Sequence, residues 1–232
     1  MTLTIDTPLG QIAAAAPTSI AVLERHALDY CCGGKRSLAA ACRDRGLDPA
    51  SVLAEIEAGG SGLPAAADET DWSARPMTDL VNHLLETHHV YLKQNLDRLA
   101  QLAAKVASVH GENHPEMRQV RDVYGKLHAE MEPHLMKEEQ ILFPAILRLE
   151  RDQLTPPLTG RIAVMEAEHD EVGRDLAALR ELTAGYAIPD DACMSYRMLL
   201  TGLAELERDT LAHVHKENNL LFPRVLAATT KE

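Results

Sequence analysis

Two copies of one short pattern each place a histidine four residues before a glutamate. The eleven residues that begin at His134 match the eleven that begin at His213, with six identities and an offset of 79 residues. Both phenylalanines of the chain fall inside this repeat. Imidazole and carboxylate groups together suit iron, manganese or zinc better than calcium or magnesium, which prefer oxygen ligands. The repeat therefore predicts a metal site with the ligands His134, Glu138, His213 and Glu217.

Each copy continues a stripe of residues spaced alternately four and three apart, which is the core-facing side of a bundle helix. The first stripe is Val120, Tyr124, Leu127, Met131, His134, Glu138 and Ile141. The second is Leu199, Leu203, Leu206, Thr210, His213, Glu217 and Leu220. A buried carboxylate costs several kcal/mol unless it is paired or coordinated. Two at one level of a bundle favour a shared metal, although two buried His–Glu hydrogen bonds, or two exposed pairs, are alternatives.

Two further histidines lie on similar stripes. His169 follows Ile162 and Met165 and precedes Val172, whereas His83 lies on a shorter and weaker stripe. Each half of the bundle is then a helical hairpin that gives one histidine, followed by a histidine and a glutamate. His88 and His89 fall well round the helix from His83, so we interpret them as flanking groups or as groups that contact a ligand from outside.

Other histidines have weaker claims to a metal. His128 and Glu132 share the same spacing but lie off the stripe. His110 and His114 are also four residues apart, in a Gly-Glu-Asn-His-Pro setting that predicts a loop. We exclude both pairs from the predicted site.

The composition predicts an all-α protein. Aromatic residues make up only 3% of the chain while hydrophobic residues reach 46%, which favours close-packed helices over aromatic-rich strands. No segment alternates with a period of two. Four long helices over 76–107, 116–150, 158–184 and 192–227 predict an antiparallel four-helix bundle within residues 76–232. Residues 1–60 predict a small domain of short helices, and residues 61–75 a linker.

Charge and targeting signals narrow the class further. The net charge of −12 argues against a nucleic-acid or anionic-membrane surface. The first ten residues lack the basic region of a secretory signal, and no apolar run approaches a membrane span. Four cysteines are too few for a disulfide scaffold, and Cys42 and Cys193 are interpreted as structural. We expect a cytoplasmic protein with reduced thiols.

Four histidines and two glutamates suit a pair of metal ions. Two glutamates from facing helices can each bridge both ions, and an oxo or hydroxo group can join them, with two histidines on each ion. Octahedral iron would then keep a sixth position for a small diatomic molecule. We expect two iron ions, with manganese or zinc as alternatives.

Several motifs resemble a known family. They are Asp29-Tyr30-Cys31-Cys32-Gly33-Gly34, Met165-Glu-Ala-Glu-His169-Asp-Glu and the two copies of the repeat. Together they resemble the hemerythrin-like domain, and more closely the RIC (repair of iron centres) family of iron–sulfur cluster repair di-iron proteins. The resemblance covers nearly the whole chain. It implies iron ligation by His83, His134, His169 and His213, with Glu138 and Glu217 as bridges.

The resemblance also implies a function. It suggests a homodimer that restores iron–sulfur proteins damaged by nitric oxide or oxidants, acting as a donor of iron or electrons rather than as a turnover enzyme. Cys31 and Cys32 are the candidate reactive thiols that the resemblance favours, with two small residues in a turn as the alternative. A nitric oxide scavenger and an iron sensor are alternative functions. Pro133 should disturb the helix next to His134.

Overall fold

The structure, a computed structural model, describes residues 2–59, 70–153, 155 and 157–229. These residues are helical and contain no β-strand, only an isolated bridge between Pro8 and Ser37, so the all-α prediction is confirmed. The short elements of the first eighty residues are α1 (Leu9–Ala15), α2 (Ser19–Arg25), α3 (Leu38–Asp44), α4 (Pro49–Glu57) and the 3₁₀ turn η1 (Trp72–Ala74).

Four long helical segments follow, and three of them contain a π-helical turn. The segments are α5 (Met77–His83), η2 (Leu84–His89) and α6 (Val90–His110); α7 (Glu116–Lys137), η3 (Glu138–Leu142) and α8 (Phe143–Leu149); α9 (Thr159–Leu182); and α10 (Met194–His215), η4 (Lys216–Leu221) and α11 (Phe222–Thr229). Each agrees with a predicted helix to within three residues. Helix α7 continues through Pro133.

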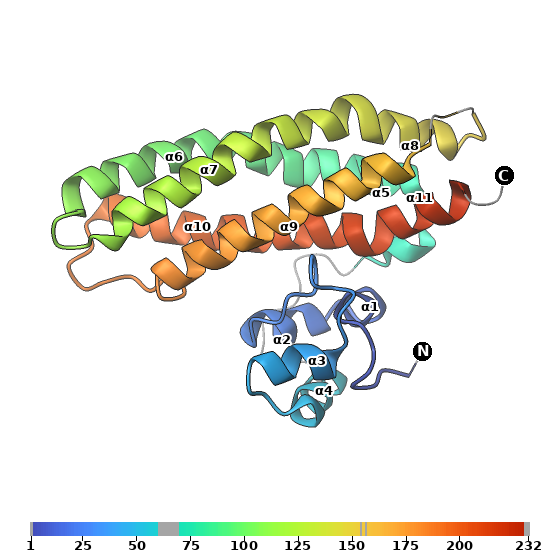
Figure 1. Cartoon of the computed structure of the whole chain (residues 1–232), viewed down its shortest axis with the longest axis horizontal. Helices are drawn as coiled ribbons and strands as arrows, with labels where there is room; N and C mark the ends of the chain where they lie inside the picture. Colours follow the sequence, from blue (N-terminus) through green and yellow to red (C-terminus); the bar gives the residue numbers. More distant parts are fainter. Residues whose placement is uncertain (1, 60–69, 154, 156, 230–232) are drawn as a thin grey trace. The chain divides into compact units, whose positions relative to one another are not determined.

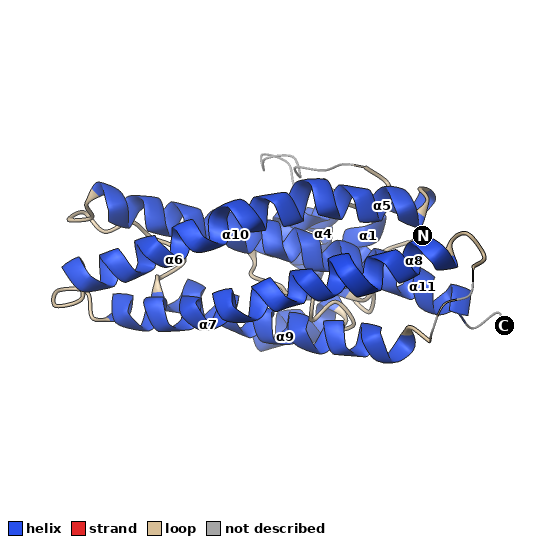
Figure 2. Ribbon diagram, turned by 90° about the horizontal axis from the view of Figure 1, so that it is seen from above, coloured by secondary structure: helices blue, strands red, loops and turns tan. Residues whose placement is uncertain are grey.

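By its contacts the chain forms two compact units, residues 81–213 and residues 1–80 with 214–232. The first contains the antiparallel helices α6, α7, α9 and most of α10, which lie side by side in Figures 1 and 2. The second joins the short N-terminal helices to the end of the fourth long segment. The predicted linker at 61–75 lies mostly outside the described residues, so the domain boundaries stay a prediction.

The core of residues 81–213 consists of leucine, valine, alanine and methionine side chains with very few rings. Tyr124 is fully buried, and its hydroxyl donates to the Leu96 carbonyl over 2.9 Å. Gly202 of α10 lies so close to α6 that a Cβ atom there would approach Leu99 Cδ2 to 2.5 Å. Small residues therefore set the spacing between these two helices.

The short N-terminal helices begin and end with residues suited to those positions. The Ser37 hydroxyl accepts from the Ala40 amide at the start of α3, and Asp48 caps α4. Gly46 and Gly59 follow α3 and α4 with positive φ angles, which glycine adopts without strain. Both glycines therefore lie where a helix ends.

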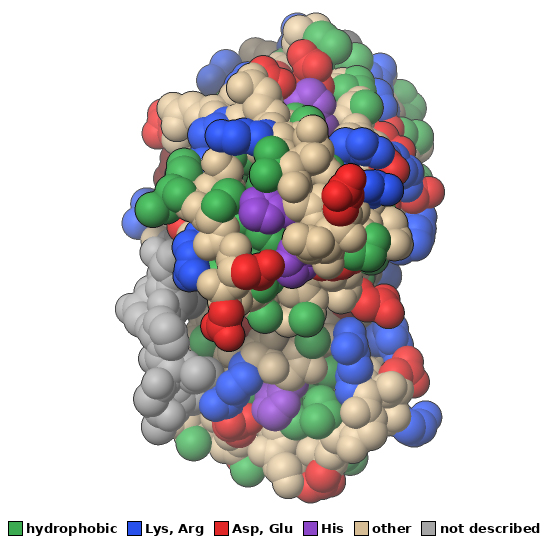
Figure 3. Space-filling model, turned by 90° about the vertical axis from the view of Figure 1, so that its left-hand side faces the viewer, with side chains coloured by type: hydrophobic (Ala, Val, Ile, Leu, Met, Phe, Trp, Pro, Cys, Tyr) green, Lys and Arg blue, Asp and Glu red, His purple; other side chains and the backbone are tan. Residues whose placement is uncertain are grey.

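Charged side chains of both signs are interspersed over the face shown in Figure 3. This mixed surface accompanies the net charge of −12. None of the described helices combines the length and the apolar character that a membrane span requires.

Replacing Gly202 tests the close packing of α6 against α10. The Gly202→Ala variant should lose about 1–3 kcal/mol of unfolding free energy, because Leu99 is fully buried and has little room to move. Gly125→Ala is the matched control, because a Cβ there meets nothing within 4 Å and alanine favours helix by about 1 kcal/mol. Urea unfolding measures both. Equal stability of the two variants would contradict this account.

Candidate metal centre

The three π turns lie where histidines and glutamates gather. Turn η3 begins at Glu138 and η4 at Lys216, and each is followed directly by a Phe-Pro pair. Proline has no N–H to donate, and its ring clashes with the carbonyl four residues earlier. A regular α-helical ladder cannot continue at that carbonyl, and a π turn is one way in which a helix accommodates the break. The repeat thus specifies both a His–Glu pair and the turn that follows it.

A π turn adds one residue, so it changes which side chains face inward beyond it. Ile141, which the predicted stripe placed in the core, is 46% exposed, whereas Leu142 is buried. In the second copy Leu221 is buried in place of the half-buried Leu220. The predicted stripes are therefore correct up to Glu138 and Glu217 and shifted by one residue after them.

The first group of ligand-type side chains is His134, Glu138 and His169. Each offers an atom within 4.8 Å of the others, and all three are buried. The Nε2 atom of His134 lies 3.1 Å from Glu138 Oε1 and 3.2 Å from His169 Nε2. His169 Nε2 is 3.9 Å from the same glutamate oxygen. Two imidazole nitrogens therefore converge on one oxygen of Glu138.

The second group is His89, Glu138 and His213, again within 4.8 Å of one another and buried. The Nε2 atom of His89 lies 3.4 Å from Glu138 Oε2, and the His89 and His213 ring centroids are 5.0 Å apart. Glu138 thus belongs to both groups and turns one oxygen toward each. This is the arrangement that a carboxylate bridging two cations requires.

Glu138 is fully buried, and neither of its oxygens accepts a well-formed hydrogen bond from a residue that the structure describes. Burial alone would raise the pKa of its carboxyl. The charge of His134 and contacts with His134, His169 and His89 outweigh burial and hold that pKa well below the usual range. The carboxylate is therefore ionised at neutral pH and is a suitable metal ligand.

Glu217 is also fully buried. It follows His213 by four residues in one uninterrupted helical segment, so both side chains lie on the same face of that segment. Glu138 and Glu217 thus occupy equivalent and fully buried positions in the two copies of the repeat.

Two carboxylates on the outer side of the histidines were not predicted. The Nδ1 atom of His134 lies 2.8 Å from Glu168, which also pairs with Lys137. Burial would raise the pKa of Glu168, but these two neighbours lower it, so it is an ionised acceptor. His134 Nδ1 must then donate, and when the ring is neutral its Nε2 has a lone pair directed toward Glu138. Lone pairs and carboxylate oxygens that converge in this way repel one another unless a cation or a shared proton lies between them.

The second outer carboxylate belongs to Glu139. Glu139 Oε1 lies 2.8 Å from His89 Nδ1. The same oxygen lies 2.5 Å from Lys93 Nζ. Carboxylates that orient metal-binding histidines in this way fix the tautomer and raise the basicity of the ligand nitrogen. Glu168 directly precedes His169 and Glu139 directly follows Glu138 in the sequence. Neither glutamate is on a core stripe, so the periodicity of the sequence could not identify them.

The structure does not bring His83 into either group. His83 is half-buried, with Thr87 Oγ1 3.3 Å from its Nδ1. Val90, seven residues after His83, is 45% exposed, and the buried line runs instead through Leu84 and Leu92. His89 is the histidine of this helical segment that lies in a buried group. This placement differs from our interpretation of His89 as a flanking group, whereas His88 lies in neither group.

The π turn η2 explains why both histidines are buried. Because a π turn is wider than an α turn, two successive residues face inward at its end. His88 stacks in parallel on the ring of His213, with centroids 5.3 Å apart, and its Nδ1 lies 2.9 Å from Asp209. Two successive histidines, His88 and His89, were the feature of the sequence that could have indicated this arrangement. We assumed a regular α-helical period there, which placed both side chains away from the core.

The remaining histidines and cysteines lie elsewhere. The ring of His114 contacts Asp191 and Glu116, and the ring of His110, at the end of α6, lies 3.1 Å from the exposed Cys193. His128 contacts Asp97. Cys42 is buried.

Cys31 and Cys32 lie in a tight loop of the N-terminal region, with 3.6 Å between their sulfur atoms. The Asp29 carboxylate accepts from the amides of Cys31, Cys32 and Gly33 over 3.1, 3.0 and 2.9 Å. Cys31 is buried, and its contact with Cys32, together with burial, raises its pKa well above the usual value. Cys31 is therefore a thiol at neutral pH, and Cys32 is the more exposed of the pair.

Comparison with known proteins agrees with this geometry. Residues 80–225 match the Hemerythrin HHE cation binding domain, and residues 5–59 match a Domain of Unknown function (DUF542). "Iron-sulfur cluster repair protein YtfE" of Escherichia coli O157:H7 and that of Escherichia coli O6:K15:H31 (strain 536 / UPEC) are each 35% identical to this chain over 222 residues. That alignment covers 96% of this chain and 97% of theirs. The chain belongs to this family of iron–sulfur cluster repair proteins.

The side chains present fit the cation that the family's HHE domain binds. Two pairs of buried histidines flank an ionised carboxylate, and outer carboxylates orient two of the rings. Mixed imidazole and carboxylate ligation suits iron. This member of the iron–sulfur cluster repair family therefore has a buried set of histidines and glutamates that is able to hold metal.

Replacing His89 or His83 tests which histidine of the first long segment binds metal. The His89→Ala variant should lose more than about 100-fold in iron affinity, above the roughly 10–100-fold loss typical of removing a group that only orients a ligand. His83→Ala is the matched control and should keep its iron, since His83 lies outside both groups. Metal analysis after anaerobic reconstitution measures both. Iron loss in His83→Ala alone would contradict the geometry.

Proposed function

We propose that this protein repairs damaged iron–sulfur clusters and that it does so with two iron ions held in the bundle. The observation that carries the proposal is the position of Glu138, whose two oxygens face two different pairs of histidines. The relatives called iron–sulfur cluster repair proteins support it, because their sequences align over nearly the whole chain.

In the proposed centre, His134 and His169 would hold one iron and His89 and His213 the other, with Glu138 shared between them. Glu217 would be the second shared carboxylate. The repeat supports the role of Glu217, because Glu138 and Glu217 occupy the same position in it and both are fully buried. When bound, such iron is a source of metal or of electrons.

The protein's own groups control how firmly that iron is held. The lysine–glutamate pairs outside His134 and His89 keep each Nδ1 protonated and each Nε2 available to a cation. Glu168 and Glu139 are 29% and 26% exposed at their side chains. A partly exposed carboxylate exchanges its hydrogen bond for water more readily than a buried one, which suits a centre that must release metal or electrons.

A damaged cluster needs iron, electrons or both before its protein regains activity. We therefore propose damaged iron–sulfur proteins as the partners, and a stoichiometric repair factor rather than a turnover enzyme. We propose that the Cys31 and Cys32 thiols take part in the transfer of iron or electrons.

The isosteric change Glu138→Gln tests the proposal. It should lower bound iron to less than half and abolish reactivation of nitric oxide-damaged aconitase, because an amide cannot bridge two cations as an anion can. Glu132→Gln is the matched control, since Glu132 is exposed on the same helix and follows a histidine at the same spacing. Full reactivation by iron-depleted Glu138→Gln would overturn the proposal.

A further inference from the structure

Asn219 lies in the middle of the π turn η4, two residues after Glu217, and its side chain contacts the loop that carries the two thiols. Its Nδ2 atom donates to the carbonyls of Tyr30 and Cys31 over 3.1 and 3.3 Å. The same atom lies 3.1 Å from the Nδ1 atom of His215. One amide therefore joins the thiol loop to the turn that holds a proposed bridging glutamate.

Two glycines make the space that the Asn219 side chain occupies. A Cβ atom on Gly10 would lie 2.0 Å from Asn219 Oδ1, and its three nearest atoms would all belong to Asn219. A Cβ atom on Gly34 would lie 2.7 Å from the same oxygen. The Gly10 amide donates to the Gly34 carbonyl over 2.9 Å, which joins the two sides of this recess.

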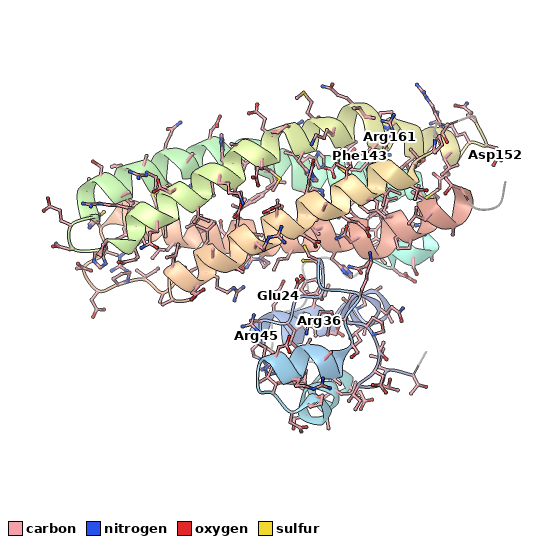
Figure 4. All side chains as sticks on the ribbon, viewed as in Figure 1. Glu24, Arg36, Arg45, Phe143, Asp152 and Arg161 are labelled. Carbon is pink, nitrogen blue, oxygen red and sulfur yellow. The ribbon has the colours of Figure 1, made fainter. Side chains whose placement is uncertain are left out.

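The thiol loop is rigid around that contact. Asp29 binds the amides on one side, and the Arg36 amide donates to the Gly33 carbonyl on the other; Arg36 is labelled in Figure 4. The Tyr30 hydroxyl donates to Glu24, also labelled there, and its ring packs edge-on against His215. The carbonyls that Asn219 binds belong to Cys31 and to the residue before it, so the amide fixes the backbone of the buried thiol.

The first copy of the repeat has a different residue at the position of Asn219. Gln140 occupies the position of Asn219 in the turn η3 and is exposed. The repeat keeps the ligands and the Phe-Pro pair, whereas this position differs between its two copies. Asn219 therefore has a task that the π turn itself does not require.

We propose that Asn219 is a positioning residue that holds the Cys31–Cys32 pair against the π turn carrying Glu217. The expected effect on repair rests on the proposed function. The expected effect on the thiols rests only on the geometry of the loop. Without the Asn219 amide, the loop opens more often, the buried Cys31 thiol becomes accessible, and repair falls although iron stays bound.

Four variants and one control test the proposal. Asn219→Asp keeps the shape but loses the donor, and Gly10→Ala displaces the Asn219 side chain without changing it. Each should raise the rate at which iodoacetamide modifies Cys31 by about tenfold, as expected for the loss of two ordinary hydrogen bonds that keep the loop closed. The double variant Gly10→Ala with Asn219→Ala should react no faster than Asn219→Ala alone, since Gly10 then has nothing to displace. Gly160→Ala, where a Cβ meets nothing within 4 Å, is the control for helix propensity.

Iron content and aconitase reactivation are measured on the same samples, and circular dichroism melting excludes variants that do not fold. The expected result is faster Cys31 modification and lower repair at unchanged iron content. Unchanged thiol reactivity in Asn219→Asp, or effects of Gly10→Ala and Asn219→Ala that multiply, would overturn the positioning role. If wild-type protein fails to reactivate aconitase while the thiol rates change as expected, the proposed function fails and the positioning role stands.

Discussion

A single buried carboxylate, Glu138, constrains this structure more than any other group. Removing an ionised carboxylate from water costs several kcal/mol unless opposite charge compensates it. Here the compensation comes from histidines on all four long helical segments, so those segments must meet at one level of the bundle. The apolar core below that level is built of small and aliphatic side chains, which let the helices approach closely enough for the imidazoles to converge.

The π turns are the local means by which the chain reaches this arrangement. In a regular α-helix about one residue per turn faces the core along a given line. In a wider π turn two neighbouring residues can face the core. In the second and fourth segments a Phe-Pro pair accompanies the turn, and in the first segment two successive histidines do. The same irregularity therefore serves the ligands in three of the four segments.

The helices and the burial of five of the six predicted ligand residues could be predicted from the sequence, because a core stripe repeated at a fixed offset leaves few alternatives. His83 lies outside the two buried groups, because its stripe is short and an α-helical period does not hold across η2. Glu139 and Glu168 could not be found, since flank positions carry no periodic signal. The contact between Asn219 and Cys31 joins residues 188 positions apart, and nothing in either segment alone indicates the other.

The division of the chain into units has a consequence for biosynthesis. The helices α1 to α4 have only seven to nine residues each, too few to persist alone in water. The loop between α2 and α3 binds Asn219, and Trp72 and Arg75 at the η1 turn bind Arg224, so this unit depends on residues far along the chain. A growing chain cannot complete this unit until α11 leaves the ribosome. The N-terminal thiols, although synthesised early, are thus among the last groups to reach their final surroundings.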